Sequence, residues 1–191
     1  MKLVLPTLVV AVGVGRLAGG SLTSLGTLRV RLPALALLGL LLQLILPPGN
    51  WPLVLLMISF LLLVVFVSAN IRVAGVSLIA VGIALNFLVI AVNHGMPVTK
   101  QAIIASGQQD ALPGLISDPG AKHHLAGSGD RLMFLGDVLP IAPPVRQIVS
   151  VGDIVTYAGV GWLVVAAMRR RDPPGAPAGA DGTREVARVG A

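Results

Sequence analysis

Residues 93–153 read NHGMPVTKQAIIASGQQDALPGLISDPGAKHHLAGSGDRLMFLGDVLPIAPPVRQIVSVGD and form a polar segment, interrupted by proline and glycine, between two apolar runs. The segment contains all three histidines and five of the eight acidic residues of the chain. Because these residues carry most acid-base and metal chemistry in proteins, any reactive group is to be sought here. The apolar runs on either side decide the fold class.

The composition is that of an integral membrane protein. Of the 191 residues, 55% are hydrophobic and 12% are charged, and the mean hydropathy is +0.89. Soluble domains average about 25% charged residues. Each helical crossing of a bilayer takes about 20 residues, so a chain of this length has room for one compact bundle and a modest polar region. We therefore expect a single domain.

Two further absences and the distribution of charge exclude several functions. The chain has no cysteine, which excludes disulfides, thiolate metal ligands and a cysteine nucleophile. The net charge of +6 would suggest nucleic acid in a soluble protein, but here the arginines lie beside apolar runs and indicate topology instead. A phosphate-binding GxxxxGK[ST] loop is missing from the sequence. We expect no nucleic-acid partner.

The apolar runs predict an all-α, polytopic transmembrane helical bundle with about five spanning helices. The predicted spans are 3–20, 32–46, 53–68, 73–92 and 151–168. The run 32–46 is short for a crossing, so a re-entrant hairpin remains open there. Residues 1–171 would form one membrane domain, and the Pro-, Gly- and Ala-rich residues 172–191 a disordered tail.

Polar residues within the runs predict local contacts. The amide of Asn86 lies in an apolar run and should find a partner on another helix. Gly15 and Gly19 have the GxxxG spacing that allows close helix approach. Trp51 lies in a proline-rich turn over 47–52 that suits a membrane interface.

Basic residues predict the orientation. With five crossings, one side of the membrane receives Arg29, Arg31, Arg72 and Arg169 to Arg171. That side should be the cytoplasm by the positive-inside rule. The amino terminus and the loop 93–150 would then face outward, and the carboxyl terminus would be cytoplasmic.

The loop itself predicts two short interfacial helices. Thr99 to Ser106 suits a helix that ends at Gly107, and Asp130 suits the cap of a turn over Arg131 to Leu135. Both pieces carry apolar side chains that are expected to lie on the membrane surface or in the mouth of the bundle. A loop of this length with its own elements is more often functional than idle.

Three motifs carry a family resemblance. Asn93 with Gly95 to Val98, RLMFLGDVLP at Arg131 to Pro140, and SVGDIVTYAG at Ser150 to Gly159 resemble a bacterial family of small multi-pass integral membrane proteins catalogued only as a domain of unknown function. The resemblance covers roughly residues 1–170. It implies a membrane fold in the bacterial cell membrane and names no substrate.

Asp137 and Asp153 form the first candidate pair, since each follows a glycine beside the outer membrane face. Two such carboxylates can activate water together. The structural alternative for Asp153 is a capping box, because Ser150 stands three residues before it at the start of a helix. For Asp137 the alternative is an ion pair with Arg131 or Arg146.

Histidines and basic residues give two weaker patterns. His123 and His124 are adjacent and diverge in a helix or a strand, and His94 has no ligand spacing to either, so we expect no metal. The basic residues Lys100, Lys122, Arg131 and Arg146 have the charge to hold an anionic lipid head group. Interleaved acids favour a mixed surface instead.

Two functions follow. The first is a membrane module that binds a lipid, peptide or protein partner through the outer loop 93–150, without a cofactor; its partners would be membrane lipids and a protein or a lipid-linked molecule at the outer face. The second is an aspartate-dependent hydrolase at the outer membrane surface with Asp137 and Asp153. The candidate loop residues are Asn93, Pro97, Arg131, Asp137 and Asp153. The sequence leaves the oligomeric state open.

Overall fold

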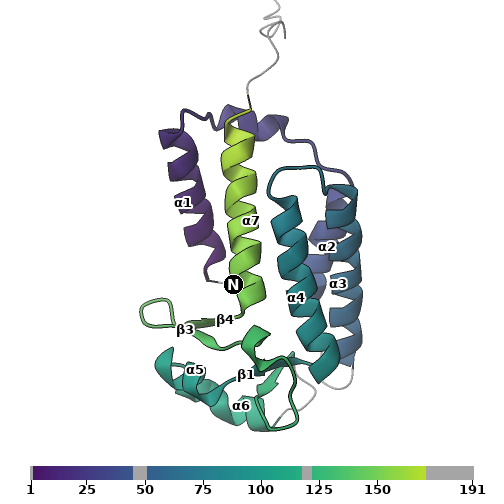
Figure 1. Cartoon of the computed structure of the whole chain (residues 1–191), viewed down its shortest axis with the longest axis vertical. Coiled ribbons are helices and arrows are strands. Elements are labelled where there is room, and N and C mark those ends of the chain that lie inside the picture. The colour runs from purple at the N-terminus through teal and green to yellow at the C-terminus, as the bar shows by residue number, and fades with distance from the viewer. Residues whose placement is uncertain (1, 45–50, 118–121, 171–191) are drawn as a thin grey trace, which may run out of the picture.

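Five long helices form the body of the protein. The computed structural model describes residues 2–44, 51–117 and 122–170, so the predicted tail 172–191 and most of the predicted turn 47–52 lie outside the described residues. The long helices run side by side along the long axis of the molecule (Figure 1). They are α1 (Val4–Leu17), α2 (Pro33–Leu44), α3 (Trp51–Ala69), α4 (Val76–Asn93) and α7 (Val151–Met168).

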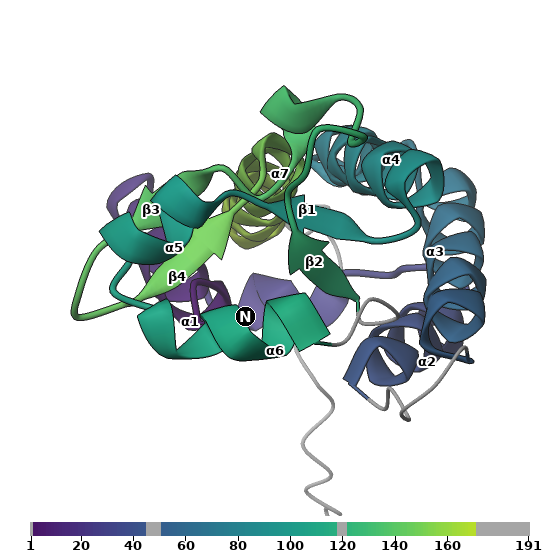
Figure 2. The same cartoon turned by 90° about the horizontal axis from the view of Figure 1, so that it is seen from below.

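The five helices form a curved row in which neighbours in space are not always neighbours in the chain. The last helix, α7, packs between α1 and α4, and α4 packs against α3, which packs against α2. Seen along the bundle, α1 and α2 are the two ends of this row (Figure 2). The apolar core lies where α3 and α4 meet, around Leu56, Phe60, Ile83 and Ile90.

Two of these helices have the length and apolarity to cross a membrane. They are α4 and α7, each with 18 residues, whereas the apolar stretches Val4–Leu17, Pro33–Gln43 within α2 and Leu53–Ala69 within α3 are shorter. The five predicted apolar runs are therefore helical, but the five-span bundle goes beyond this test of length and composition. The run 32–46 is among the short ones, as expected.

Glycines bring α4 and α7 into backbone contact. Gly75 and Gly82 lie seven residues apart at the start and middle of α4, and Gly152 and Gly159 have the same spacing on α7. Seven residues are about two helical turns, so each pair lies on one face. A Cβ on Gly159 would lie 2.8 Å from the Gly75 carbonyl oxygen, and a Cβ on Gly152 would lie 2.8 Å from that of Gly82. Side chains larger than hydrogen do not fit at these crossings.

The contact of α1 with α7 also uses glycine. A Cβ on Gly20 would lie 2.9 Å from the backbone carbon of Met168, and Gly15 faces the side chain of the same methionine. The Ser21 N–H donates to the Met168 carbonyl oxygen at 2.8 Å. The predicted GxxxG pair is thus half correct, because Gly19 faces open space and Gly20 packs in its place.

A small mixed structure, which we call the roof (residues 94–150), covers one end of the bundle. It contains β1 (Met96–Val98) paired in parallel with β2 (His123–Leu125), and β3 (Leu139–Ile141) paired antiparallel with β4 (Gln147–Val149). Its short helices are α5 (Lys100–Ala105), η2 (Gln109–Ala111), α6 (Leu112–Ser117) and η3 (Met133–Leu135). The all-α expectation is therefore wrong for the roof. Strands of three residues are too short to show an alternating pattern in the sequence.

The first predicted roof helix is confirmed, and the second predicted piece is present as a short turn without its predicted cap. Thr99 caps α5, since its hydroxyl accepts from the Ala102 N–H at 3.3 Å. The second piece is one 3₁₀ turn whose cap position is Leu132, at φ +55°. Asp130 does not cap it, because its carboxylate accepts from the Gly127 N–H at 2.8 Å and contacts His124.

The roof and the arginines lie at opposite ends of the bundle. The Lys2 ammonium donates to the Arg146 carbonyl oxygen at 3.2 Å, which places the amino-terminal end of α1 beside the roof. At the far end, η1 (Thr23–Thr27) follows α1, and the α3–α4 turn and the end of α7 lie near it (Figure 1). That end carries Arg29, Arg31, Arg72, Arg169 and Arg170.

Candidate functional site

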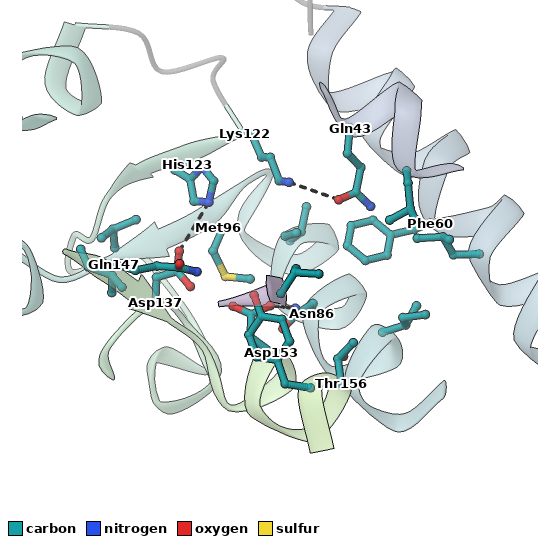
Figure 3. A pocket seen from close by; sticks show the side chains of 18 of the residues that line it. Gln43, Phe60, Asn86, Met96, Lys122, His123, Asp137, Gln147, Asp153 and Thr156 are labelled. Atoms are coloured by element: carbon teal, nitrogen blue, oxygen red, sulfur yellow. Dashed lines mark hydrogen bonds and ion pairs between the residues drawn. The ribbon is translucent and has the colours of Figure 1, made fainter. Parts of the chain in front are cut away.

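A cavity of about 660 Å³ lies between the long helices and the roof, and every long helix contributes to its lining. Most of its wall is aliphatic or aromatic. The polar side chains gather where the helices meet the roof, as Figure 3 shows. Those polar side chains are Gln43, Asn86, Gln108, Lys122, His123, Asp137, Gln147, Asp153, Thr156 and Tyr157.

Asp153 is held at the start of α7 by the predicted capping box. Its carboxylate accepts from the Ser150 N–H at 3.1 Å, and the Ser150 hydroxyl accepts from the Asp153 N–H at 3.0 Å. The other carboxylate oxygen accepts from the Asn86 side chain at 2.8 Å, and the Ser150 hydroxyl donates to the Asn86 oxygen at 2.8 Å. The interhelical partner expected for Asn86 is therefore this cap, so one network closes both the helix end and the α4–α7 contact.

Asp137 is the second carboxylate of the cavity, and it is 7% exposed. Its backbone is fixed to β1, since its N–H donates to the Pro97 carbonyl oxygen at 3.0 Å. One carboxylate oxygen lies 3.4 Å from Nε2 of His123. Burial, reinforced by the negative charge of Asp153 and opposed by Lys122, raises the pKa of Asp137 to about 7. This carboxyl is thus poised to exchange a proton near neutral pH.

The ion pairs expected for Asp137 are wrong. Arg146 donates from its guanidinium to the Gly107 carbonyl oxygen and lies 3.7 Å from Asp110. Arg131 contributes its backbone, which exchanges two hydrogen bonds with the Asn93 side chain at 2.8 and 2.9 Å. A sequence cannot show which cation reaches a buried acid when the roof is folded from short, irregular pieces.

The two adjacent histidines point to opposite sides of β2, as a strand requires. His124 lies 2.9 Å from Asp130 on the outer side, and His123 faces the cavity. The His123 side chain lines the cavity and is 41% exposed. Burial and the charge of Lys122 lower the pKa of His123 to about 4, so it is neutral at pH 7. No three potential metal ligands cluster within the described ranges.

Lys122 and Gln43 are site residues that the sequence reasoning did not assign to a cavity. The Lys122 ammonium donates to Gln43 at 3.3 Å, Gln43 donates to the Ser59 hydroxyl at 2.9 Å, and Ser59 donates to the Gly39 carbonyl oxygen at 2.7 Å. Burial lowers the pKa of Lys122, against the attraction of Asp153 and Asp137. A signal did exist, because Gln43 is the one polar side chain in the apolar run 32–46.

The remaining candidate residues frame the site. Asn93 ends α4 and ties it to the segment before η3 through Arg131. Pro97 is buried in β1 between Met96 and Val98, which line the cavity. Its neighbour Val98 forms the β-bridge to Asp137. Three of the five candidates, Asn93, Pro97 and Arg131, therefore position the roof, and Asp137 and Asp153 line the cavity.

The raised pKa of Asp137 predicts a pH dependence of stability. Between its ordinary value of 3.8 and about 7 the folded carboxyl binds more protons than the unfolded one, so the free energy of unfolding falls as pH rises through this window. The lowered pKa of His123 acts in the opposite direction, but this contribution fades as pH rises above the ordinary value of 6.5. Between about pH 6.5 and 8 the contribution of Asp137 is the larger of the two. Asp137→Asn should remove the loss of stability there.

Thermal unfolding of the detergent-solubilised protein and of Asp137→Asn, across that pH interval, measures the difference. Asp130→Asn is the matched control. Asp130 contacts His124 on the outer side of β2, whereas Asp137 lies beside His123 on the cavity side of the same strand. An equal slope in the wild type and in Asp137→Asn would show that Asp137 titrates normally.

Comparison with known proteins identifies a family whose function is unknown. A family model described as "Family of unknown function (DUF5317)" matches residues 27–165. No curated protein and no solved structure matches the chain. The matched residues include α2, α3, α4, the whole roof and most of α7, and hence nearly all of the cavity lining.

Proposed function

Because the chain belongs to the DUF5317 family, whose function is unknown, we propose a function from the cavity itself: the protein is a multi-pass membrane protein that binds a single amphiphilic lipid. The hydrocarbon chain of the lipid lies between the helices, and its head group lies beneath the roof. The carrying observation is the division of one cavity into a long apolar part and a polar end.

Exposed apolar side chains support the membrane location. Helices that display aliphatic side chains on their outer faces are typical of lipid-facing bundles. Such side chains occur on all five long helices, including Val9, Leu38, Leu61, Leu88 and Trp162. The short helices α1 and α2 would cross a thin or locally deformed bilayer, or would enter one leaflet.

The arginine end supports an orientation. We propose that the protein lies in a bacterial cell membrane, with the arginine end in the cytoplasm and the amino terminus and roof outside. In the described part, the roof carries acidic and basic residues in similar numbers, whereas the opposite end carries arginines alone. Residues after Arg170 would then be cytoplasmic.

The position of the polar groups favours a lipid over a peptide or protein partner. The polar side chains Lys122, Asp137 and Gln147 point into the cavity beneath the roof rather than outward (Figure 3). A cavity of about 660 Å³ lies in the range of small-molecule sites, which is about 300–1,000 Å³. A folded partner would contact the outer surface of the roof and leave these groups unused.

The row of helices supplies a route of entry. α1 and α2 both line the cavity, through Thr7 and Leu40 among others, but they are the two ends of the row and pack against α7 and α3 instead. A lipid in the surrounding bilayer can therefore enter sideways between α1 and α2, so its chain never passes through water.

Bridging α1 to α2 is expected to abolish lipid uptake. The chain lacks cysteine, so Thr7→Cys with Leu40→Cys can be joined specifically by a cleavable bismaleimide. Native mass spectrometry, with the protein kept soluble by an amphipathic polymer that has no free single-chain amphiphile, would measure uptake of a panel of dodecyl-chain amphiphiles. Bridged protein should bind at least about tenfold less, and cleavage of the bridge should restore binding.

Single-cysteine variants capped with the corresponding monomaleimide separate closure from simple obstruction. Uptake that persists after bridging would contradict lateral entry. If no amphiphile of the panel binds the unmodified protein, the proposed function fails.

The hydrolase with Asp137 and Asp153 is the second candidate, favoured by the near-neutral pKa of Asp137 in the same cavity as Asp153. The capping box and the Asn86 contact favour a structural role for Asp153. Release of a cleaved product from a bound ester in the same spectra, and its loss in Asp153→Asn, would support the hydrolase.

A further inference from the structure

The polar end of the cavity contains its own counter-ions. Within the described lining, the lysine and acidic side chains are Lys122, Asp137 and Asp153. The two acidic residues attract the Lys122 ammonium, and burial together with the proximity of Asp153 raises the pKa of Asp137. One ammonium group therefore faces two carboxyl groups, and groups of opposite charge already lie together before any ligand enters.

The remaining polar groups suit hydroxyls. Gln147 and Tyr157 each carry a donor and an acceptor, and neutral His123 carries one of each. The Gln43 amide keeps one N–H and one lone pair beyond its bonds to Ser59 and Lys122. An alcohol group is likewise both donor and acceptor, so it can bind to either end of an amide. A phosphate only accepts once it is fully ionised, and an ammonium only donates.

Resting on the proposed lipid-binding function, we propose that the bound head group is uncharged and carries hydroxyl groups, as in a monoacylglycerol or a glycosyl lipid. Phosphate-headed and ammonium-headed amphiphiles of the same chain length are discriminated against.

A phosphate head group is disfavoured by the carboxyl groups that lie near Lys122. The phosphate would lie beside Asp137 and Asp153, and the one ammonium that faces it already donates to Gln43 at 3.3 Å. No arginine lines the cavity in the described ranges, although arginine is the residue suited to hold phosphate by paired hydrogen bonds. Four basic residues have the charge to hold an anionic head group, but of these only Lys122 lines the cavity. The other three, Lys100, Arg131 and Arg146, are absent from the described lining.

An ammonium head is disfavoured by the same balance. Lys122 supplies the cation that Asp137 and Asp153 attract, so a second cation would lie near the first in a partly buried site. Like charges at short range and low dielectric repel strongly. An uncharged head leaves the existing pairs intact.

Competition among matched amphiphiles tests the inference. Native mass spectrometry of the full chain, near neutral pH, would compare monolauroylglycerol, dodecyl glucoside, dodecyl phosphate and dodecylamine. We expect the two hydroxyl heads to bind at least about tenfold more tightly than the phosphate and the amine, since a buried uncompensated charge is costly. The glycerol and glucoside arms distinguish the two sources of hydroxyls.

Two charge variants give the stronger readout. Lys122→Met leaves the carboxylates without their cation and should shift the preference towards dodecylamine by about tenfold or more. Asp153→Asn keeps the cap through its amide oxygen and should shift the preference towards dodecyl phosphate. The opposite shifts are unlike a general loss of packing, which would weaken all four ligands together.

The outcomes separate the two proposals. Equal affinity for all four heads, or tighter binding of phosphate or amine by the wild type, overturns the head-group inference while leaving lipid binding in place. Charge variants that do not change the ranking overturn it as well. Failure of all four to bind removes the lipid-binding function itself.

Discussion

Gly159→Ala is expected to destabilise the bundle strongly, although it adds only one methyl group. The new Cβ would lie 2.7 Å from the Ile79 nitrogen and 2.8 Å from the Gly75 carbonyl oxygen. These are backbone atoms, so relief requires α4 and α7 to separate along their shared face. Overpacking a rigid contact costs about 1–3 kcal/mol, and here the separation also opens the neighbouring Gly82–Gly152 crossing, so the upper end of that range is expected.

Gly161→Ala is the matched control. Gly161 lies two residues further along α7, and a Cβ there would have nothing within 4 Å. Because alanine is the better helix former by about 0.5–1 kcal/mol, this variant should be as stable as the wild type or more so. Membrane abundance and thermal unfolding in detergent measure both. Equal behaviour of the two variants would show that the α4–α7 glycine contact is not needed.

Asn86→Leu is expected to be the most damaging change outside the four glycines of the α4–α7 contact. It removes the donor to the Asp153 carboxylate and the acceptor of the Ser150 hydroxyl, and Ser150 is fully buried. Interhelical hydrogen bonds in membranes average about 0.6 kcal/mol. This loss should be larger, about 2–4 kcal/mol, because a partly buried carboxylate and a buried hydroxyl both lose a partner.

A double-mutant cycle with Asp153→Ala identifies the cause. If Asn86→Leu lowers stability because the Asp153 carboxylate loses its hydrogen-bond donor, the same change should destabilise the Asp153→Ala variant much less than the wild type. Unfolding in detergent supplies all four stabilities. Additive losses, or a loss near the membrane average, would mean that Asn86 acts through packing alone.

The sequence was informative wherever one residue or one periodic run carried the signal. Ser150 and Asp153 stand three residues apart, which is the spacing of a capping box, and the structure confirms it. Asn86 is polar within an apolar run, and its expected partner on another helix is confirmed. The short helix predicted over Thr99 to Ser106 is also confirmed, as α5.

The cavity required information that is spread along the chain. Lys122, Gln43 and Asp137 come from a strand end, a helix and a loop, and they meet only because the roof folds back over the row of helices. The roof is built from strands of three residues, and β1 pairs in parallel with β2 more than twenty residues later. Neither length nor periodicity shows such a pairing in one sequence. The seven-residue spacing of the glycines in α4 and α7 can be read from the sequence. Many other glycines in the chain face open space, so the spacing alone does not identify the contact.

The place of α7 between α1 and α4 has a consequence for biogenesis. α1 is synthesised well before α7, the helix against which it packs. At a synthesis rate of about 5–20 residues per second, on the order of 10 s separates them. During that interval α1 and the α4 glycines both lack the partner that they have in the folded protein. The row of helices therefore cannot close before α7 has been made, and α7 joins two parts of the bundle that were synthesised earlier.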